Sequence, residues 1–391
     1  MRVVELVGIG PGPFAAMMLA DLGADVIRVD RPGGNALMIA PPAKDILGRG
    51  RPSVAINLKD PKGVGLVLDL VENADVLIEG FRPGVTERMG LGPADCLARN
   101  PKLVYGRMTG WGQDGPLAQT AGHDVNYISI AGALHPIGRA GGPPQIPLNL
   151  VGDFGGGALY LVAGVLAAVI EARTSGKGQV VDAAIVDGAA HLMSMMVTMQ
   201  QAGAWSDERG TNLLDTGSPF YDVYETSDGK HMSVGGLEPQ FYAAMEKLLE
   251  IDPSLPHELR SREVPPGSGQ AKLPDRYDIS KWPELRSRLA ARFAEKTQAE
   301  WAEVFDGSDA CVAPVIPLSE APQHPHNVAR GTYVEHEGLM QPAPAPRFSR
   351  TPATLTTPPA GPGANTTEAL AAWGIQDVDQ LVADGVAVQT D

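Results

Sequence analysis

The chain has 391 residues, of which 43% are hydrophobic, and a formal net charge of −15 at pH 7. This length allows two or three globular domains, and the acidic excess argues against nucleic acid or an anionic membrane as partner, because either needs a broad basic face. The two cysteines, Cys96 and Cys311, are too few for a disulfide framework or a metal cluster. Together with an N-terminal segment that lacks the features of a signal peptide, they favour a cytoplasmic protein.

The first two hundred residues alternate short apolar runs with helical patterns, which is typical of an α/β domain with a mostly parallel sheet. We predict helices over 14–22 and 61–72. We predict strands over 3–8, 24–30, 53–58, 74–80, 102–108 and 179–185. This order of elements predicts a Rossmann-like large domain.

A smaller α+β domain is predicted after residue 219. Residues 220–235 resemble two strands around a Ser-Asp-Gly turn, and 238–250 and 284–306 have helical patterns. Between these helical patterns, 252–281 is rich in Pro, Ser and charge and is expected to be an exposed insertion. A last short helix is predicted over 367–373, after proline-rich linkers.

The expected domain division follows from these patterns. The large domain comprises 1–186 and 325–391, a linker helix and loop span 187–219, and the small domain spans 220–324. Within the large domain, residues 154–170 carry no charge and are at the lower limit of length for a membrane span. The glycines in this segment and its solitary occurrence favour a buried helix that threads between domains or subunits.

A glycine-rich turn, GIGPGP at 8–13, follows the first strand and precedes a helix, and Asp30 ends the next strand. This arrangement resembles a dinucleotide-binding fingerprint. Pro13 stands where the third glycine belongs, and Pro11 lies between the others, so close packing of a pyrophosphate on the turn is disfavoured. We predict a Rossmann-like half that holds another nucleotide, or none.

Basic residues lie near the ends of successive predicted strands. They are Arg31, Arg49, Arg51, Lys59, Arg82 and Arg88. Because open α/β sheets bind ligands at the C-terminal ends of their strands, the set suggests a compact anion site for phosphates. Each residue alone is better explained as a solvated surface charge, and only the clustering favours a site.

His123 and Asp153 are the candidate proton-transfer residues. Each follows a glycine, in GHDVNY and GDFGGG, at the expected start of a helix, where free N–H groups and the positive end of the dipole stabilise an anion. Asp and His after Gly are also ordinary helix caps, so both interpretations remain open from the motifs alone. As a pair they suggest proton transfer on a substrate that forms an anion.

Several segments form a combination that is more specific than any single motif: RVVELVGIGPGPFAAMMLADLGADVIRVDRP, SVAINLKDPKG, VLIEGFRPGVTERMGLG, LVYGRMTGWGQDGP, GHDVNY, GDFGGG, SGKGQVVDAAIVDG and CVAPV. Together they resemble the family III (CaiB/BaiF) CoA-transferases and, within that family, most closely the α-methylacyl-CoA racemases. The resemblance covers nearly the whole chain apart from 252–281 and the C-terminal tail.

The resemblance implies that the large domain binds coenzyme A at the ends of its strands. The implied binding residues are Arg31, Ile56, Asn57, Leu58, Lys59, Gly80, Phe81, Arg82, Arg88, Gly122, Asp124, Val125, Asn126 and Tyr127. It also implies an interlocked homodimer, with each active site between the large domain of one subunit and the small domain of the other.

The implied activity is an isomerase of lipid metabolism that interconverts (2R)- and (2S)-2-methylacyl-CoA thioesters without a cofactor. His123 and Asp153 would flank the α-carbon as base and acid, and the helix start at Asp124 would supply N–H groups for the enolate oxygen. Glu238, in VGGLEP, resembles the carboxylate that hydrogen-bonds the catalytic histidine.

Some assignments stay open. Met193, Met195, Met196 and Met199 either form a soft surface for the acyl chain or pack in the core. His324 and His326 have no partners at ligand spacing, so no metal is expected.

Two alternative functions are kept. The first is a CoA-transferase in which Asp153 attacks the thioester and forms a mixed anhydride. The His123 and Glu238 pair, and GGLEP in place of a run of glycines, favour the racemase. The second is a catalytically silent protein that binds coenzyme A or a nicotinamide nucleotide, which the intact set His123, Asp153 and Glu238 argues against.

Overall fold

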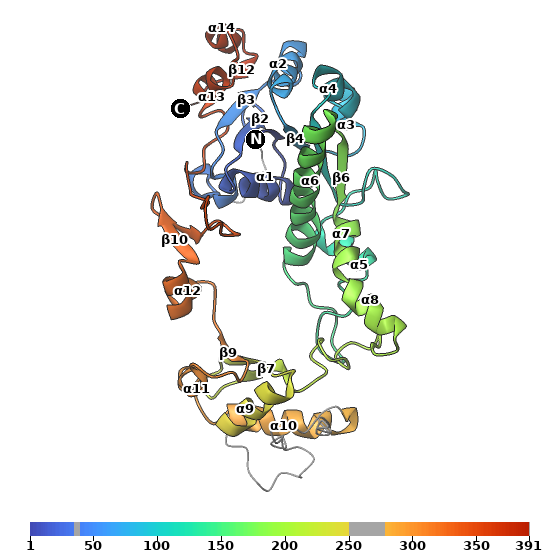
Figure 1. Cartoon of the computed structure of the whole chain (residues 1–391), viewed down its shortest axis with the longest axis vertical. Helices are drawn as coiled ribbons and strands as arrows, with labels where there is room; N and C mark the ends of the chain where they lie inside the picture. The colour runs from blue at the N-terminus through green and yellow to red at the C-terminus, as the bar shows by residue number, and fades with distance from the viewer. Residues whose placement is uncertain (35–39, 250–277, 391) are drawn as a thin grey trace. The chain divides into compact units, whose positions relative to one another are not determined.

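The computed structural model describes residues 1–34, 40–249 and 278–390 and divides the chain into two compact units. The large unit comprises Met1–Ala133, Pro147–Ser194 and Pro325–Asp391, and the small unit comprises Leu134–Ile146 and Met195–His324. Figure 1 shows the elements of both units along the chain. Of the predicted insertion at 252–281, residues 252–277 lie outside the described residues.

The large unit is built on a seven-stranded sheet with the order β12-β3-β2-β1-β4-β5-β6. The strands are β1 (Arg2–Leu6), β2 (Asp25–Asp30), β3 (Ser53–Ile56), β4 (Val76–Glu79), β5 (Val104–Thr109), β6 (Val180–Ala184) and β12 (Ala387–Val388). β1 to β6 pair in parallel, whereas β12 pairs with β3 antiparallel. The predicted α/β fold is confirmed, and all six predicted strands are present with ends shifted by a few residues.

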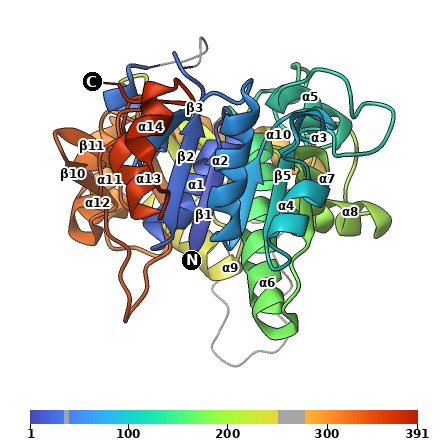
Figure 2. The same ribbon diagram turned by 90° about the horizontal axis from the view of Figure 1, so that it is seen from above.

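Successive residues of the strands point to opposite faces of this sheet, and each face has its own apolar core. Val4, Ile27 and Leu77 pack on one face, while Val3 and Val26 pack on the other. Figure 2 shows α2, α13 and α14 in front of the strands, with α6 on the other side of the sheet. Because both faces are covered, the parallel strands read as continuous apolar runs in the sequence.

The helices of the large unit are α1 (Pro11–Asp21), α2 (Pro61–Glu72), α3 (Val85–Met89), α4 (Pro93–Arg99), α5 (Asp124–Ile130), α6 (Leu159–Ser175), α7 (Ile185–Leu192), α12 (Pro325–Arg330), α13 (Thr366–Ala372) and α14 (Val378–Ala383). A hairpin of β10 (Tyr333–His336) and β11 (Leu339–Pro342) also belongs to this unit. Short 3₁₀ turns cover Pro42–Lys44 and Ile46–Gly48. The sequence predicted α13 but not α14 or the edge strand β12, which are short and gain their order by packing on the sheet.

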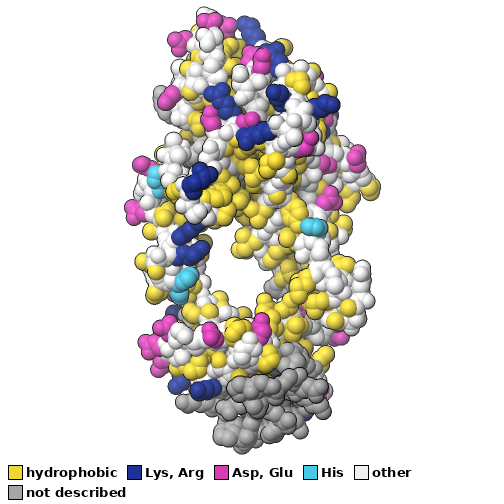
Figure 3. Space-filling model, viewed as in Figure 1, with side chains coloured by type: hydrophobic (Ala, Val, Ile, Leu, Met, Phe, Trp, Pro, Cys, Tyr) yellow, Lys and Arg dark blue, Asp and Glu magenta, His cyan; other side chains and the backbone are white. Residues whose placement is uncertain are grey.

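A π-helical segment, Leu150–Ala158, leads directly into α6. Together they form a continuous helix, Leu150–Ser175, that is long and apolar enough to cross a membrane by length and composition alone. Leu161 and Val165 on this helix are fully buried against the sheet, whereas Ile170 is 67% exposed. The apolar segment is therefore a core helix on one side, with an exposed apolar face on the other, and Figure 3 shows apolar side chains on the surface over α6.

The small unit contains an antiparallel sheet of β7 (Tyr221–Glu225), β8 (His231–Gly235) and β9 (Val312–Val315). Its helices are α8 (Ser194–Gln201, of which only the first residue belongs to the large unit), α9 (Pro239–Leu248), α10 (Trp282–Phe293) and α11 (Gln298–Phe305), with 3₁₀ turns at Ile279–Lys281 and Ala321–Gln323. The helical pattern predicted over 284–306 is divided between two helices, α10 and α11. Thr297 and Glu300 form a capping box, in which the Thr297 N–H donates to Glu300 Oε2 at 2.8 Å, and this starts a new helix.

Candidate active site

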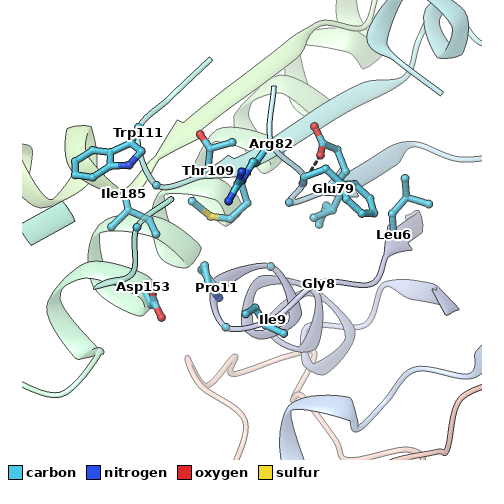
Figure 4. Close-up of a pocket in the computed structure, with 18 of the residues that line it drawn as sticks. Leu6, Gly8, Ile9, Pro11, Glu79, Arg82, Thr109, Trp111, Asp153 and Ile185 are labelled. Carbon is cyan, nitrogen blue, oxygen red and sulfur yellow. Dashed lines mark hydrogen bonds between the residues drawn. The ribbon is translucent and has the colours of Figure 1, made fainter. Parts of the chain in front are cut away.

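A cavity of about 680 Å³ opens at the C-terminal ends of β1, β4 and β5. This is where the strand order reverses between β1 and β4, the position at which doubly wound sheets bind ligands. All residues that line the cavity belong to the large unit. Figure 4 shows Asp153, Pro11 and Ile9 on one side of it, with Arg82 and Thr109 on the other.

The glycine-rich turn at 8–13 forms part of the cavity wall and leads into α1. Gly10 has a φ of 68°, and a Cβ placed there would lie 3.2 Å from Asp153 Oδ2. Glycine is therefore needed both for the left-handed backbone and for the close approach of the Asp153 carboxylate. In this structure the turn lies against the Asp153 carboxylate, whereas in a dinucleotide site the corresponding turn lies against the pyrophosphate of the ligand.

Asp153 is held by the π-helical segment, which packs against α7 in direct backbone contact. A Cβ on Gly156 would lie 2.6 Å from Ala189 N, and a Cβ on Gly188 would lie 1.8 Å from Gly156 O. The glycines of GDFGGG thus allow two helices to meet without side chains between them. π-Helical turns are rare and often occur at functional sites.

His123 is the N-cap residue of α5 and lines the same cavity as Asp153. Its N–H donates to Asn126 Oδ1 at 3.0 Å, and the preceding carbonyl of Gly122 accepts the Tyr127 hydroxyl. The Tyr127 ring meets Trp111 edge-on at 4.7 Å. The backbone at His123 is therefore fixed, while its imidazole is exposed.

Burial raises the pKa of the Asp153 carboxyl, and the Asn149 amide, which donates to Asp153 Oδ2 at 3.3 Å, opposes this rise. The nearby Asp124 carboxylate raises the pKa of Asp153 further, and His123 lowers it. The net rise favours the protonated acid more than in water, which suits a group that must donate a proton as well as accept one.

The N–H of Asp153 is not free, contrary to what its expected place at a helix start suggested. It donates to Asp124 Oδ2 at 2.7 Å. Asp124 is only 8% exposed and is not among the residues that line the cavity. Its side chain therefore caps the segment that carries Asp153.

The basic residues named from the sequence divide into two groups. Arg31 and Arg82 line the cavity, and Lys59 and Arg88 do not. Arg49 forms a buried ion pair with Asp21 at 2.6 Å, and Arg51 forms one with Glu5. Their inclusion in an anion site is wrong, because each guanidinium is already neutralised inside the fold.

The other implied coenzyme-binding residues also divide. Leu58, Gly80, Phe81, Gly122 and Tyr127 line the cavity. Ile56, Asn57, Val125 and Asn126 lie close to them in sequence but outside the lining. Glu238 belongs to the small unit, where it is the N-cap residue of α9.

Sequence reasoning missed a carboxylate that shapes the loop after β4. Glu79 is fully buried and accepts the Phe81 N–H at 2.7 Å, the hydrogen bond drawn in Figure 4, and its other oxygen accepts Arg107 Nε at 2.9 Å. Arg107 also pairs with Glu87 on α3 at 2.9 Å. This network fixes Gly80, Phe81 and Arg82 at the cavity edge. The available signal was a charged residue at the end of each of two neighbouring apolar strands.

Comparison with known proteins places this geometry in a family. The family model of CoA-transferase family III matches residues 1–366. The chain belongs to this family. It is 42% identical to the α-methylacyl-CoA racemase of Mus musculus, over 100% of this chain and 97% of the relative, and 43% identical to that of Homo sapiens, over 90% and 87%.

Other members of the family are more distant. The succinyl-CoA:glutarate CoA-transferase of Homo sapiens is 28% identical over 95% of this chain and 84% of the relative. The crystal structure of a CaiB/BaiF family protein from Brucella suis superimposes with a TM-score of 0.79 at 25% identity, covering 95% of this chain and 98% of that one. The fold of this chain is therefore shared with another protein of the CaiB/BaiF family.

Proposed function

We propose that this chain is an α-methylacyl-CoA racemase, an isomerase of lipid metabolism that interconverts (2R)- and (2S)-2-methylacyl-CoA thioesters. The observation that carries the proposal is that His123 and Asp153, from two different elements, line one cavity at the switch point of the sheet. The similarity to two racemases over nearly the full chain supports it.

Inversion at the α-carbon needs two proton-transfer groups on opposite faces of the substrate. One group removes the α-hydrogen as a proton, and the electron pair of the broken C–H bond forms the enolate. The other group, protonated beforehand, then donates its proton to the opposite face, and the thioester is regenerated. We assign these roles to His123 and Asp153, which exchange roles when the opposite enantiomer binds, so that no cofactor is needed.

The cavity also offers contacts for the charged parts of the substrate. Arg31 and Arg82 on its wall match the phosphates of coenzyme A, since guanidinium groups bind phosphate oxygens with two parallel hydrogen bonds. Asp124 is the first residue of α5, where a backbone N–H has no acceptor within the helix. Asp124 itself lies outside the cavity lining, but its N–H directly follows the lining residue His123. We assign this N–H to the enolate oxygen, a contact whose loss typically costs about 3 to 4 kcal/mol.

A CoA-transferase is the second candidate, because the family contains transferases such as the human enzyme for succinyl-CoA and glutarate. In that reaction Asp153 would attack the thioester as an ionised nucleophile. A histidine on the same cavity wall, as in this chain, is needed for proton transfer and not for anhydride formation.

Deuterium exchange separates the two reactions. A pure (2R)-2-methylacyl-CoA is incubated with the protein in D₂O, with and without a free carboxylic acid as acceptor. We expect epimerisation with deuterium at C2 in both samples. Movement of coenzyme A to the added acid, with no exchange in its absence, would show a transferase instead.

The assembly that we propose is a cytoplasmic homodimer in which Glu238 of the partner subunit hydrogen-bonds His123. Such a bond would fix the imidazole tautomer and raise its basicity. Large apolar side chains of α6 and α7, including Ile170 and Leu192, are exposed, and their burial would favour self-association.

A further inference from the structure

We propose that Asp124 is a positioning residue for proton transfer: its carboxylate ties the backbone that carries Asp153 to the helix start that carries His123. The inference rests on the proposed racemase and gives Asp124 a side-chain role distinct from substrate contact. Its basis is one hydrogen-bond arrangement between α5 and the π-helical segment.

The N–H groups at the start of a helix have no acceptors within it, so a buried start needs a side chain from elsewhere. In the π-helical segment, the N–H of Asp153 donates to Asp124 Oδ2 at 2.7 Å. Asp124 lies 29 residues earlier in the chain and directly follows His123. One carboxylate therefore links the two elements that carry the proposed acid and base.

The absence of a side chain at Gly152 makes room for the Asp124 carboxylate. A Cβ on Gly152 would lie 2.2 Å from Asp124 Oδ2 and 2.9 Å from Ile128 Cγ2, so only glycine admits the carboxylate. Asp124 Oδ1 is buried without a hydrogen-bond partner among the described residues. A buried carboxylate that is only half satisfied costs stability, and such a cost is often retained where a function needs the group.

Asp124 also acts on Asp153 through its charge. The polar groups that face Asp153 are Asn149 before the π-helical segment, and His123, Asp124 and Tyr127 at α5, whereas the turn before α1 contributes the uncharged Gly10. Asp124 is the negatively charged group in this set. It also accepts the backbone N–H of Asp153, so this N–H cannot stabilise another anion. Removing the charge should let Asp153 ionise at lower pH.

The test compares Asp124→Asn with Asp124→Ala in the full-length protein, using C2 exchange and racemisation of a 2-methylacyl-CoA. The amide oxygen of Asn can still accept the Asp153 N–H, whereas Ala cannot. We expect Asp124→Ala to lower kcat at least tenfold with little change in KM, and Asp124→Asn to retain most of kcat while the acidic limb of the pH profile moves to lower pH. Near-normal kcat in Asp124→Ala, or equal losses in both variants with an unmoved acidic limb, would overturn the inference.

Asp182→Asn is the matched control. Asp182 on β6 is more exposed than Asp124, but partial burial also raises its pKa and it also accepts a backbone N–H, from Gln113 at 3.2 Å. It does not line the cavity. We expect the acidic limb of the pH profile of Asp182→Asn to match that of the unmodified protein.

A second readout does not depend on catalysis. Carboxyl ¹³C NMR follows the titration of Asp153, whose signal is assigned by its loss in Asp153→Asn. A lower midpoint in Asp124→Asn supports the inference even if Asp124→Ala does not fold, and an unchanged midpoint contradicts it. Absence of racemisation by the unmodified protein would refute the proposed function while leaving this titration result valid.

Discussion

At the scale of single residues, the surroundings of His123 and Asp153 distinguish their roles. Asp153 is partly buried, and its pKa is raised by that burial, whereas His123 is exposed on a fixed backbone. A carboxyl group that holds its proton more tightly than in water lies on the same cavity wall as an exposed imidazole, and both groups can donate and accept a proton. The pair therefore suits proton transfer in both directions.

Replacing either residue should abolish most inversion at the α-carbon while hydrogen exchange at that carbon continues. In His123→Ala and Asp153→Ala, we expect racemisation to fall at least a hundredfold, because one face of the substrate loses its acid or base. Each variant keeps one group, so it should still exchange the α-hydrogen of one enantiomer with retention of configuration.

The measurement is chiral separation combined with mass detection of deuterium, started from each pure enantiomer. The two variants should prefer opposite enantiomers for exchange. If either variant racemises at a near-normal rate, its residue has no part in the mechanism.

At the scale of elements, the position of Asp153 depends on backbone contact between the π-helical segment and α7. Gly156 and Gly188 meet there, and the atoms that a new Cβ would strike belong to the backbone. A backbone clash cannot be relieved by rotating a side chain. Even one methyl group should therefore push the two elements apart.

We expect Gly188→Ala to destabilise the fold by about 1 to 3 kcal/mol and to lower kcat tenfold or more, because Asp153 moves with its segment. Thermal unfolding and steady-state racemisation measure the two effects. Gly65→Ala is the control: Gly65 lies in α2 with nothing within 4 Å of a new Cβ, so alanine should be neutral or stabilise by up to about 1 kcal/mol. Similar behaviour of the two variants would contradict this account of the contact.

At the scale of the whole molecule, the large unit holds the cavity, and Glu238 lies in the small unit. We propose that the two are combined across a dimer. In that arrangement, one subunit supplies His123 and Asp153, and Glu238 comes from the other.

Coexpression of His123→Ala and Glu238→Ala subunits tests this arrangement. A mixed dimer would contain one doubly altered site and one intact site. Random pairing should then restore about a quarter of the unmodified activity, although each variant alone is impaired. Purification through two different tags isolates the mixed dimer for assay. If Glu238 acts within its own subunit, every site in the mixed dimer carries one substitution and activity is not restored.

Much of the fold could be predicted from the sequence, since fully buried parallel strands are continuous apolar runs and α2 has a helical apolar face. The ends of elements were less predictable. The break between α10 and α11 depends on a capping box inside a helical pattern, and β12 is two residues long. The local sequence pattern does not predict such short features, because their stability comes from packing and hydrogen bonds in the folded protein.

The sequence by itself determined the sheet, the family resemblance and the two residues proposed to move the proton, because these depend on motifs and periodicity. Only the tertiary structure decided that Arg49 and Arg51 are internal ion pairs, that Gly10 makes room for the Asp153 carboxylate, and that Asp124 caps the segment of Asp153. The physical reason is that a charged side chain takes its role from the partner that folding brings to it. Those partners lie far away along the chain.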